Sequence, residues 1–387
     1  MKKNSNYLVL IILLIIIFLF IYNANIFNIK NIKKENFNNG AVITQNYKYY
    51  RCNNKMLAPI LKDIFDNNNI THSNDDWNIY IPCGYNNIEE ELNQISISNK
   101  NKNKYIFGVN GCDTIVSKNK IWESLVNCYG RNEASKLMPE SYVLEDRNEM
   151  EVFRKNFNPS LNEIYILKKN IQRKEGLKLT KDYFEIMDGT KDNYKVVQKY
   201  IRDLYLINGR KINLRVYLLI IIKDNKTYFY LCKNGKCIYT KKKYNDNDLD
   251  FESNITSYNL DMTVYKESPR HFNELIEYIN ETNKKKNDGK KLFNNIDLLM
   301  KKISLCLSKN LFQSKNIKSS VTFQLFGIDI IFDKDLNPYL LEMNKGPDMS
   351  ARDDIDKLMK NTVQQDMLKT VGILKNDNNN SFYLIYE

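Results

Sequence analysis

The chain has 387 residues, 43% of them hydrophobic, which is enough for two or three packed lobes around a sizeable core. Its 58 basic and 46 acidic residues give a formal charge of +12, which favours polyanionic partners such as nucleic acid, anionic membrane or an acidic protein tail. The abundance of Lys, Asn, Ile and Tyr fits a compositional bias without any partner equally well. Only two histidines occur, far apart, which argues against histidine-based hydrolysis. Seven scattered cysteines without a Cys-x-x-Cys pair predict free thiols, and neither a zinc site nor a disulfide framework.

The N-terminus predicts a membrane segment. Residues 7–22 form an unbroken apolar run behind Lys2 and Lys3. The run is short for the roughly 20 residues of a bilayer-spanning helix, and at or beyond the upper limit of a signal-peptide core. No small-x-small cleavage site follows it. We therefore expect residues 1–30 to be an uncleaved single-pass anchor with its flank, and a cleaved signal peptide is the alternative.

The next part of the chain predicts a stalk and a small lobe. Its first residues, to about residue 45, are rich in Asn and Lys and suit a flexible stalk, so we group 31–104 as stalk and N-terminal region. We expect 105–163 to be a small α/β N-terminal lobe. Its predicted elements are a strand at 105–109, helices at 121–129 and 133–138, and a strand at 141–144.

Residues 164–375 predict the largest domain, and 376–387 a C-terminal tail. Strands are expected at 164–169, 195–200, 211–222 and 227–232, with Asn234-Gly235 as a turn. Apolar residues recur at helical spacing from Leu292 to Leu307 and from Ile355 to Val371, so both stripes should face a core. The pattern predicts an α+β fold in which antiparallel sheets are flanked by helices.

Cationic side chains follow one face of the strand that begins at Lys211. Alternation puts Lys211, Asn213 and Arg215 on this face, inside a strand whose later positions are apolar on both faces. Buried cations need an anion, and a triphosphate suits both the point charge of Lys and the planar fork of Arg. Lys168 ends an earlier strand, and the charged loop 172–177 behind it could close over phosphates. A solvated basic loop is the plainer interpretation of that segment.

A polar hairpin predicts a metal site near the end of the chain. Asp329 lies on one face of a strand, and Glu342 and Asn344 share a face of the next. A turn symmetric about residues 335 and 336 puts Asp329 opposite Glu342. Facing carboxylates destabilise a sheet unless a cation separates them, and Mg²⁺ prefers such oxygen ligands. The hairpin therefore indicates an enzyme that uses Mg²⁺-ATP, with an ordinary acidic hairpin as the alternative.

Several segments, in this order, resemble the motifs of the tubulin tyrosine ligase-like family of ATP-grasp ligases. They are residues 196–201, 206–217, 323–329 and 341–344, and residues 139–144 are similar to the family's segment that enters the central lobe. The likeness covers roughly residues 108–374. It implies an ATP-grasp-like fold for 164–375.

The resemblance also implies roles for individual residues. Lys168 and Lys211 would hold phosphates, Arg215 would lie by the γ-phosphate, and Asn213 would belong to the nucleotide site. Adenine would contact the segment made of Gln198, Lys199, Tyr200 and Ile201. Asp329, Glu342 and Asn344 would bind Mg²⁺, and the expected catalytic residues are Arg215, Lys211 and Glu342.

The implied reaction is carboxylate activation. A substrate carboxylate takes the γ-phosphate of ATP to form an acyl phosphate, and an amine then displaces phosphate. The expected partners are ATP, a free amino acid, an acidic protein or peptide acceptor such as tubulin, and the membrane, but no nucleic acid. ATP chemistry favours a cytosolic position for the catalytic part.

The sequence departs from the family in four places. Asn213 stands where the family usually has Asp, the loop 173–176 lacks its first glycine, and Ser257 replaces an Asn. No arginine matches the one expected after Gly235. Two alternatives therefore stay open, namely a ligase for a small peptide or other non-tubulin acceptor, and a membrane-tethered, degenerate nucleotide-binding module that acts as a scaffold or tubulin binder.

Overall fold

The computed structural model describes residues 46–52, 55–95, 104–171, 176–245, 248–257 and 260–387. The predicted anchor at 7–22, the stalk, and residues 172–175 of the charged loop lie outside these ranges. Among the helices of the described residues, none is both long and apolar enough to cross a membrane. Residues 47–387 form one compact unit, which includes the segments that we separated at 104, 163 and 375.

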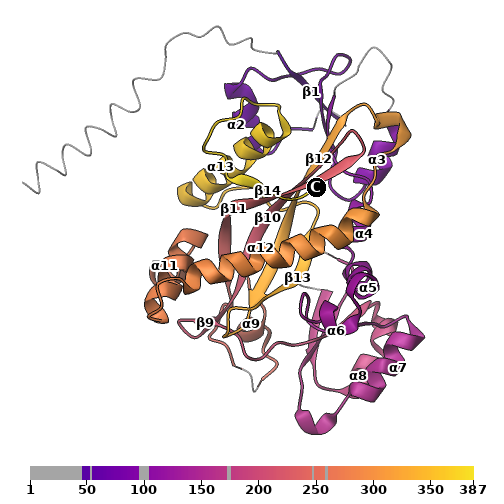
Figure 1. The fold of residues 1–387 in the computed structure, drawn as a ribbon, viewed down its shortest axis with the longest axis vertical. Helices are drawn as coiled ribbons and strands as arrows, with labels where there is room; N and C mark the ends of the chain where they lie inside the picture. Colours follow the sequence, from indigo (N-terminus) through magenta and orange to yellow (C-terminus); the bar gives the residue numbers. More distant parts are fainter. Residues whose placement is uncertain (1–45, 53–54, 96–103, 172–175, 246–247, 258–259) are drawn as a thin grey trace, which may run out of the picture. The chain divides into compact units, whose positions relative to one another are not determined.

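A large mixed sheet crosses this unit (Figure 1). Within the described residues it has ten strands, in the order β14-β11-β10-β12-β4-β3-β1-β2, with β13 paired to β12 and β9 to β10. Pairing is parallel from β12 through β4, β3 and β1 to β2 and antiparallel elsewhere. The strands are β1 Lys48–Arg51, β2 Thr71–His72, β3 Ile79–Ile81, β4 Tyr105–Phe107, β9 Leu206–Ile207, β10 Arg210–Lys223, β11 Lys226–Tyr239, β12 Val321–Phe332, β13 Pro338–Asn344 and β14 Phe382–Tyr386.

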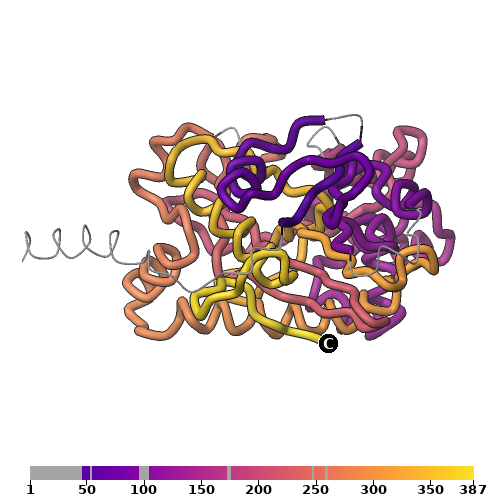
Figure 2. The backbone as a smooth tube through the Cα atoms, turned by 90° about the horizontal axis from the view of Figure 1, so that it is seen from above, coloured from indigo at the N-terminus to yellow at the C-terminus, as the bar shows by residue number. Residues whose placement is uncertain are grey.

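Helices cover both faces of the large sheet. Because side chains alternate along β10, Leu214 and Val216 pack towards α11 (Phe272–Thr282) and α12 (Asp288–Leu307). Tyr217 and Leu219 pack towards α2 (Pro59–Asn67) and α13 (Asp354–Val371). Figure 2 places α12, in orange, and α2, in indigo, on opposite sides of the strands. The cationic residues Lys211 and Arg215 therefore share the face covered by α2 and α13.

A second, antiparallel sheet carries the other part of the fold. Its strand order is β5-β8-β6-β7, with bounds β5 Ser141–Val143, β6 Tyr165–Lys168, β7 Leu177–Thr180 and β8 Val196–Lys199. A small core around Phe153 packs α7 (Arg147–Asn156) and α8 (Tyr183–Met187) against it. Asp146 caps α7 by accepting hydrogen bonds from the backbone of Asn148 and Glu149. The other helices are α3 Ile88–Gln94, α4 Cys112–Val116, α5 Lys118–Tyr129, α6 Arg131–Ala134, α9 Phe251–Asn254 and α10 Val264–Glu267, with 3₁₀ turns η2 Pro159–Leu161, η4 Gly189–Asp192, η5 Ser308–Asn310 and η6 Lys315–Ile317.

The predicted α+β class and most predicted elements are confirmed, but the turn at Asn234-Gly235 is wrong. The hairpin turns instead at Asp224 and Asn225, with φ of 53° and 62°, a left-handed conformation that Asx residues tolerate. Strand β11 runs on through Gly235, with a register shift opposite Tyr217. A side chain at Gly235 would lie 2.1 Å from the Phe272 ring of α11 and 2.5 Å from the carbonyl oxygen of Arg215. The glycine therefore allows close packing of β11 against α11 and β10, and forms no turn. The bounds of the helix predicted at 133–138 are also wrong, because α6 spans Arg131–Ala134.

The helical stripe of α13 was only partly predicted. Ile355 and Leu358, which we expected in the core, are 58% and 69% exposed. The first turns of α13 bury Asp356 and Lys360 instead. The Asp356 carboxylate lies 3.0 Å from Lys236 Nζ and 3.1 Å from Lys360 Nζ, so a buried ion-pair cluster occupies the inward positions.

The expectation of free thiols is wrong for four cysteines. Cys52 pairs with Cys83 and Cys128 with Cys306, at Cα separations of 5.3 and 6.0 Å. The partners are 31 and 178 residues apart in the chain, so local spacing carries no sign of them. The second disulfide joins α5 to α12. Three further cysteines are free and buried, namely Cys112, Cys232 and Cys237.

Candidate active site

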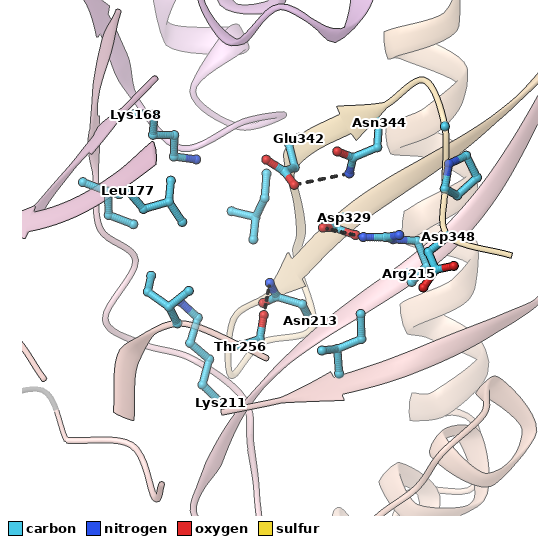
Figure 3. Close-up of a pocket in the computed structure, with 16 residues that line it drawn as sticks. Lys168, Leu177, Lys211, Asn213, Arg215, Thr256, Asp329, Glu342, Asn344 and Asp348 are labelled. Carbon is cyan, nitrogen blue, oxygen red and sulfur yellow. Dashed lines mark hydrogen bonds and ion pairs between the residues drawn. The ribbon is translucent and has the colours of Figure 1, made fainter. Parts of the chain in front are cut away.

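A cavity of about 490 Å³ lies between the two sheets (Figure 3). The small sheet contributes Lys168 and Leu177, and the large sheet faces them with acidic, basic and amide side chains. The lining residues are Ile166, Lys168, Leu177, Lys211, Asn213, Arg215, Ile238, Ile255, Thr256, Asp329, Leu341, Glu342, Asn344, Gly346, Pro347 and Asp348. The structure thus brings together Lys168, the three polar residues of β10 and the predicted metal ligands.

The acidic pair comes from the β12–β13 hairpin. Asp329 pairs with Glu342 as predicted, whereas Ile330 already pairs with Leu340. Leu341 is therefore an extra residue, and this β-bulge keeps the two carboxylates opposite each other. Asn344 shares their neighbourhood and donates a hydrogen bond from Nδ2 to Glu342 Oε1 at 3.2 Å.

Two protein cations balance this acidic pair, where we expected a metal ion to be needed. Arg215, opposite Asp329 in the sheet, donates from Nε and Nη2 to the two carboxylate oxygens at 2.6 and 3.1 Å. Lys118 Nζ lies 3.4 Å from Glu342 Oε2. Both side chains are nearly buried, so the ion pairs are weakly screened. The hairpin is therefore electrostatically satisfied by the chain itself.

The acidic pair still fits Mg²⁺. Burial raises the pKa of Asp329, while the Arg215 guanidinium opposes this effect. Burial also acts on Glu342, but Lys118 and Lys168 together hold its pKa below the usual value. Glu342 is thus ionised, as a metal ligand must be. Two carboxylates and the amide oxygen of Asn344 are a donor set that Mg²⁺ accepts.

Two buried lysines face the cavity without a carboxylate in hydrogen-bonding contact. Lys168 and Lys211 are 5% and 4% exposed. Burial lowers the pKa of Lys168 to about 8 and that of Lys211 to about 7, and Lys168 adds to the effect on Lys211. Lys211 Nζ donates to the carbonyl oxygen of Asn254 at 2.9 Å and lies 4.5 Å from the ring centre of Tyr200. An anionic ligand would restore the charge of both lysines.

Asn213 offers an unused acceptor beside them. Its Nδ2 donates to Thr256 Oγ1 at 3.0 Å, whereas its Oδ1 is buried and has no hydrogen-bond partner within the described residues. Buried polar atoms in folded proteins are nearly always hydrogen-bonded, so this oxygen suits a hydroxyl or amine of a ligand. A nucleotide or an amino acid would supply such a donor.

The predicted adenine contacts lie outside the cavity. Gln198 is buried and donates to Ser141 Oγ at 2.8 Å, which ties β8 to β5. Lys199 pairs with Glu163 at 2.5 Å. Tyr200 contacts the cavity residue Lys211, and Ile201 is half-buried beyond the end of β8. None of these four residues lines the described cavity.

Three site residues were missed from the sequence. Lys118 begins α5 and is 5% exposed. In the sequence it is one of two lysines separated by a single residue, and nothing there distinguishes it from exposed Lys120. Thr256 and Asp348 line the cavity from loops. Local sequence pattern carries no signal for any of them, because each is brought to the site by the fold.

A second cavity, of about 1080 Å³, adjoins the first at Gly346. Its lining includes Lys118, which contacts Glu342, and Lys345, which forms an ion pair with Asp113. The second cavity therefore meets the first near the predicted metal ligands.

Comparisons with known proteins agree with this arrangement. A family model described as "Tubulin-tyrosine ligase family" matches residues 96–380. A probable beta-tubulin polyglutamylase of Tetrahymena thermophila is 26% identical over 259 residues, covering 61% of this chain and 21% of that protein. The probable tubulin polyglutamylase TTLL9 of Mus musculus is 28% identical over 195 residues, covering 47% and 39%. The tubulin monoglutamylase TTLL4 of Mus musculus is 23% identical over 292 residues, covering 68% and 23%. The chain thus spans well under two thirds of the length of each of these relatives.

Proposed function

Because this chain belongs to the tubulin-tyrosine ligase family, and so to the ATP-grasp superfamily, we propose that it is an ATP-dependent ligase that adds an amino acid to a protein or peptide carboxylate. Glutamate is the first candidate for the amino acid and tubulin for the acceptor, since similar proteins are named tubulin polyglutamylases and monoglutamylases. The observation that carries the proposal is the cavity itself, in which two buried lysines without a carboxylate in hydrogen-bonding contact face an acidic hairpin.

The chemistry follows from these charges. Lys168 and Lys211 bind the phosphates of ATP and neutralise the charge that builds up during transfer of the γ-phosphate. Asp329, Glu342 and Asn344 would hold Mg²⁺, which would supply positive charge to the phosphates. Arg215, which pairs with Asp329 across the sheet, donates to its carboxylate and opposes the rise in its pKa that burial causes.

The proposed reaction has two steps. An oxygen of the acceptor carboxylate attacks the γ-phosphorus, so that ADP leaves and an acyl phosphate forms. The amine of the amino acid then attacks the acyl carbon, an amide bond forms, and phosphate and the proton of the amine leave. The unpaired Oδ1 of Asn213 is placed to accept a hydrogen bond from one of these ligands.

The second cavity supplies a route for the acceptor. It adjoins the first at Gly346, and its lining includes Lys118 beside Glu342. An acceptor that enters there arrives beside Glu342 and the predicted metal ligands.

Membrane tethering is part of the proposal. The apolar run at 7–22 would anchor the chain, and ATP supply favours a cytosolic catalytic part. The two disulfides favour the opposite side, because such bonds persist in oxidising compartments. Protease protection of sealed membranes distinguishes the two orientations, since only a catalytic part that faces outward is digested.

One observation favours a second candidate function. Asn213 removes a carboxylate from the nucleotide site, so a nucleotide-binding module that has lost turnover, and acts as a scaffold or tubulin binder, is the rival to a ligase. A ligase for a non-tubulin acceptor is the third candidate function.

A direct assay separates these candidates. The full-length protein is incubated with Mg²⁺-ATP, tubulin and labelled Glu, Gly or Tyr, and incorporation is measured by mass spectrometry. We expect incorporation of Glu that is lost in Glu342→Gln. ATP binding without incorporation into tubulin or acidic peptides would reject the ligase in favour of the binding module.

A further inference from the structure

A second charged feature lies away from the active site. Residues 284–318 contain ten lysines, no arginine and only two acidic residues, Asp288 and Asp297, which is a net charge of +8 in a chain whose total is +12. All ten lysines are exposed. We call them the lysine surface, and they are Lys284, Lys285, Lys286, Lys290, Lys291, Lys301, Lys302, Lys309, Lys315 and Lys318.

The lysine surface is not neutralised by the rest of the described chain. None of its ten ammonium groups forms an ion pair with the described residues, although lysines elsewhere, such as Lys62 and Lys191, do so. The two acidic residues of the segment have other partners, because Asp288 accepts from Asn283 and Asp297 from Tyr383. Most of the chain's excess positive charge is therefore concentrated in this one segment.

Helix α12 orders a large part of this surface. Lys291 and Lys302 are 11 residues apart on α12, which places them on one stripe of the helix, and Lys309 follows in the 3₁₀ turn η5 directly after it. Leu298 and Leu305 lie on the same stripe and are 60% and 47% exposed. A partner that supplies negative charge along about 30 Å of helix would contact these lysines together.

The surface is separate from the cavity. The inward face of α12, with Ile296 and Met300, packs on the sheet face that carries Leu214 and Val216. The cavity residues of β10 point to the other face of the sheet. In Figure 1, α12 lies across the strands with its outer side towards the viewer. A ligand of the lysine surface therefore cannot be the bound nucleotide.

We propose that the lysine surface docks an acidic polypeptide, namely a glutamate-rich segment of the acceptor protein. This inference rests on the proposed ligase function, because an acceptor that gains glutamates is a polyanion that the reaction itself produces. The exposed leucines between the lysines suit apolar side chains of a polypeptide. About ten extended residues of a polypeptide are longer than the combined thickness of a sheet and a helix layer. One acceptor can therefore dock on the lysine surface and also enter the cavity on the other face of the sheet.

Nucleic acid and membrane fit this surface less well. Base and phosphate recognition relies heavily on arginine, which the segment lacks. A helix that binds in a lipid interface inserts a broad apolar face, whereas most apolar residues of α12 are buried against the sheet and its lysine stripe exposes two leucines.

The test is direct binding of fluorescein-labelled poly-L-glutamate to the full-length protein, followed by anisotropy at low and at physiological ionic strength. The triple variant Lys291→Glu/Lys302→Glu/Lys309→Glu is expected to lose at least about tenfold in affinity, and wild-type binding to weaken with salt.

The matched control carries the same change in net charge elsewhere. Lys155, Lys223 and Lys375 are also exposed and form no ion pair with the described residues. The variant Lys155→Glu/Lys223→Glu/Lys375→Glu is expected to lose no more than about twofold. Equal losses in the two variants would overturn the proposal, because net charge alone would explain binding. Tighter binding of phosphatidylserine vesicles or of duplex DNA than of poly-L-glutamate, with the same dependence on α12, would also overturn it.

A turnover measurement separates this inference from the proposed function. The variant Lys291→Glu/Lys302→Glu/Lys309→Glu should add glutamate to a short acidic peptide at the wild-type rate, but should act on the whole acceptor protein with a KM raised about tenfold. If neither protein shows turnover, the ligase function fails, while the binding result still decides whether the surface takes an acidic polypeptide.

Discussion

Two buried clusters of cations lie on the same face of the large sheet, and they differ in one respect. Lys236 and Lys360 share the carboxylate of Asp356, at 3.0 and 3.1 Å. Lys168 and Lys211 have no carboxylate in hydrogen-bonding contact, and burial lowers the pKa of both. Lys236 is the direct cross-strand neighbour of Arg215, so the two clusters are adjacent. The comparison teaches that a buried cation with an acidic partner belongs to the fold, whereas one without awaits a ligand.

The largest expected effect comes from removing the carboxylate that Lys236 and Lys360 share. Asp356→Asn leaves Lys236 and Lys360 buried without their counter-charge, so we expect a loss of about 3–5 kcal/mol in the free energy of unfolding. Denaturant titration measures this value. Asp354→Asn, at an exposed position of the same helix turn, is the control and should cost less than about 1 kcal/mol. Equal losses in the two variants would mean that the cluster has no special structural role.

Removing a charge from the other cluster, Lys168 and Lys211, should have the opposite effect on stability. Lys211→Met removes a buried charge without a carboxylate partner, so the free energy of unfolding should stay constant or rise by about 1–2 kcal/mol. The affinity for Mg²⁺-ATP should fall about 10- to 100-fold, because a charge-assisted contact to phosphate is lost. Calorimetric titration and thermal unfolding give both values. A variant that is destabilised and still binds ATP would show that Lys211 serves the fold.

The lowered pKa of Lys211 predicts two pH dependences of opposite sign. Between the folded pKa of about 7 and the ordinary value of 10.5, the unfolded chain binds more protons, so this group makes the folded state more stable as pH rises. The ammonium form binds phosphate, so ATP affinity should fall as pH rises, about fivefold from pH 7 to pH 8. Titrations in Lys211→Met should lack this slope. A wild-type slope that persists in the variant would assign the titration to another group.

The smallest expected effect comes from giving Lys211 a nearby carboxylate, as Lys236 and Lys360 have. Asn213→Asp places a carboxylate two residues from Lys211 on the same face of β10. A nearby negative charge favours the ammonium form, so the midpoint of the ATP-affinity profile should move up by about one pH unit. An unchanged midpoint would show that the two side chains do not interact.

The sequence predicted features that depend on local pattern. The opposition of Asp329 and Glu342 could be predicted because the polar turn from Asp333 to Asn337 separates two clearly alternating strands. The face shared by Lys211 and Arg215 follows from the same alternation. The structure brings these residues to one cavity, and their roles in binding and catalysis stay predictions.

Features that depend on distant parts of the chain could not be predicted. Lys118 is 224 residues from Glu342 along the chain, and Cys128 is 178 residues from Cys306, so neither partner leaves a local sign. Asn234-Gly235 carries a strong local turn signal, yet its pairing with β10 outweighs that signal. Ile355 has the right helical spacing, but the ion pairs of Asp356 take the inward position.

The central claim is that the cavity activates a carboxylate with ATP, and isotope transfer tests it most directly. An acidic acceptor whose side-chain carboxylates carry ¹⁸O is incubated with the full-length protein, Mg²⁺-ATP and glutamate, and the released phosphate is analysed by mass spectrometry. An acyl phosphate carries one carboxylate oxygen into the phosphate, so we expect one ¹⁸O atom in each released phosphate per amide bond formed. Amide formation with unlabelled phosphate would contradict the account.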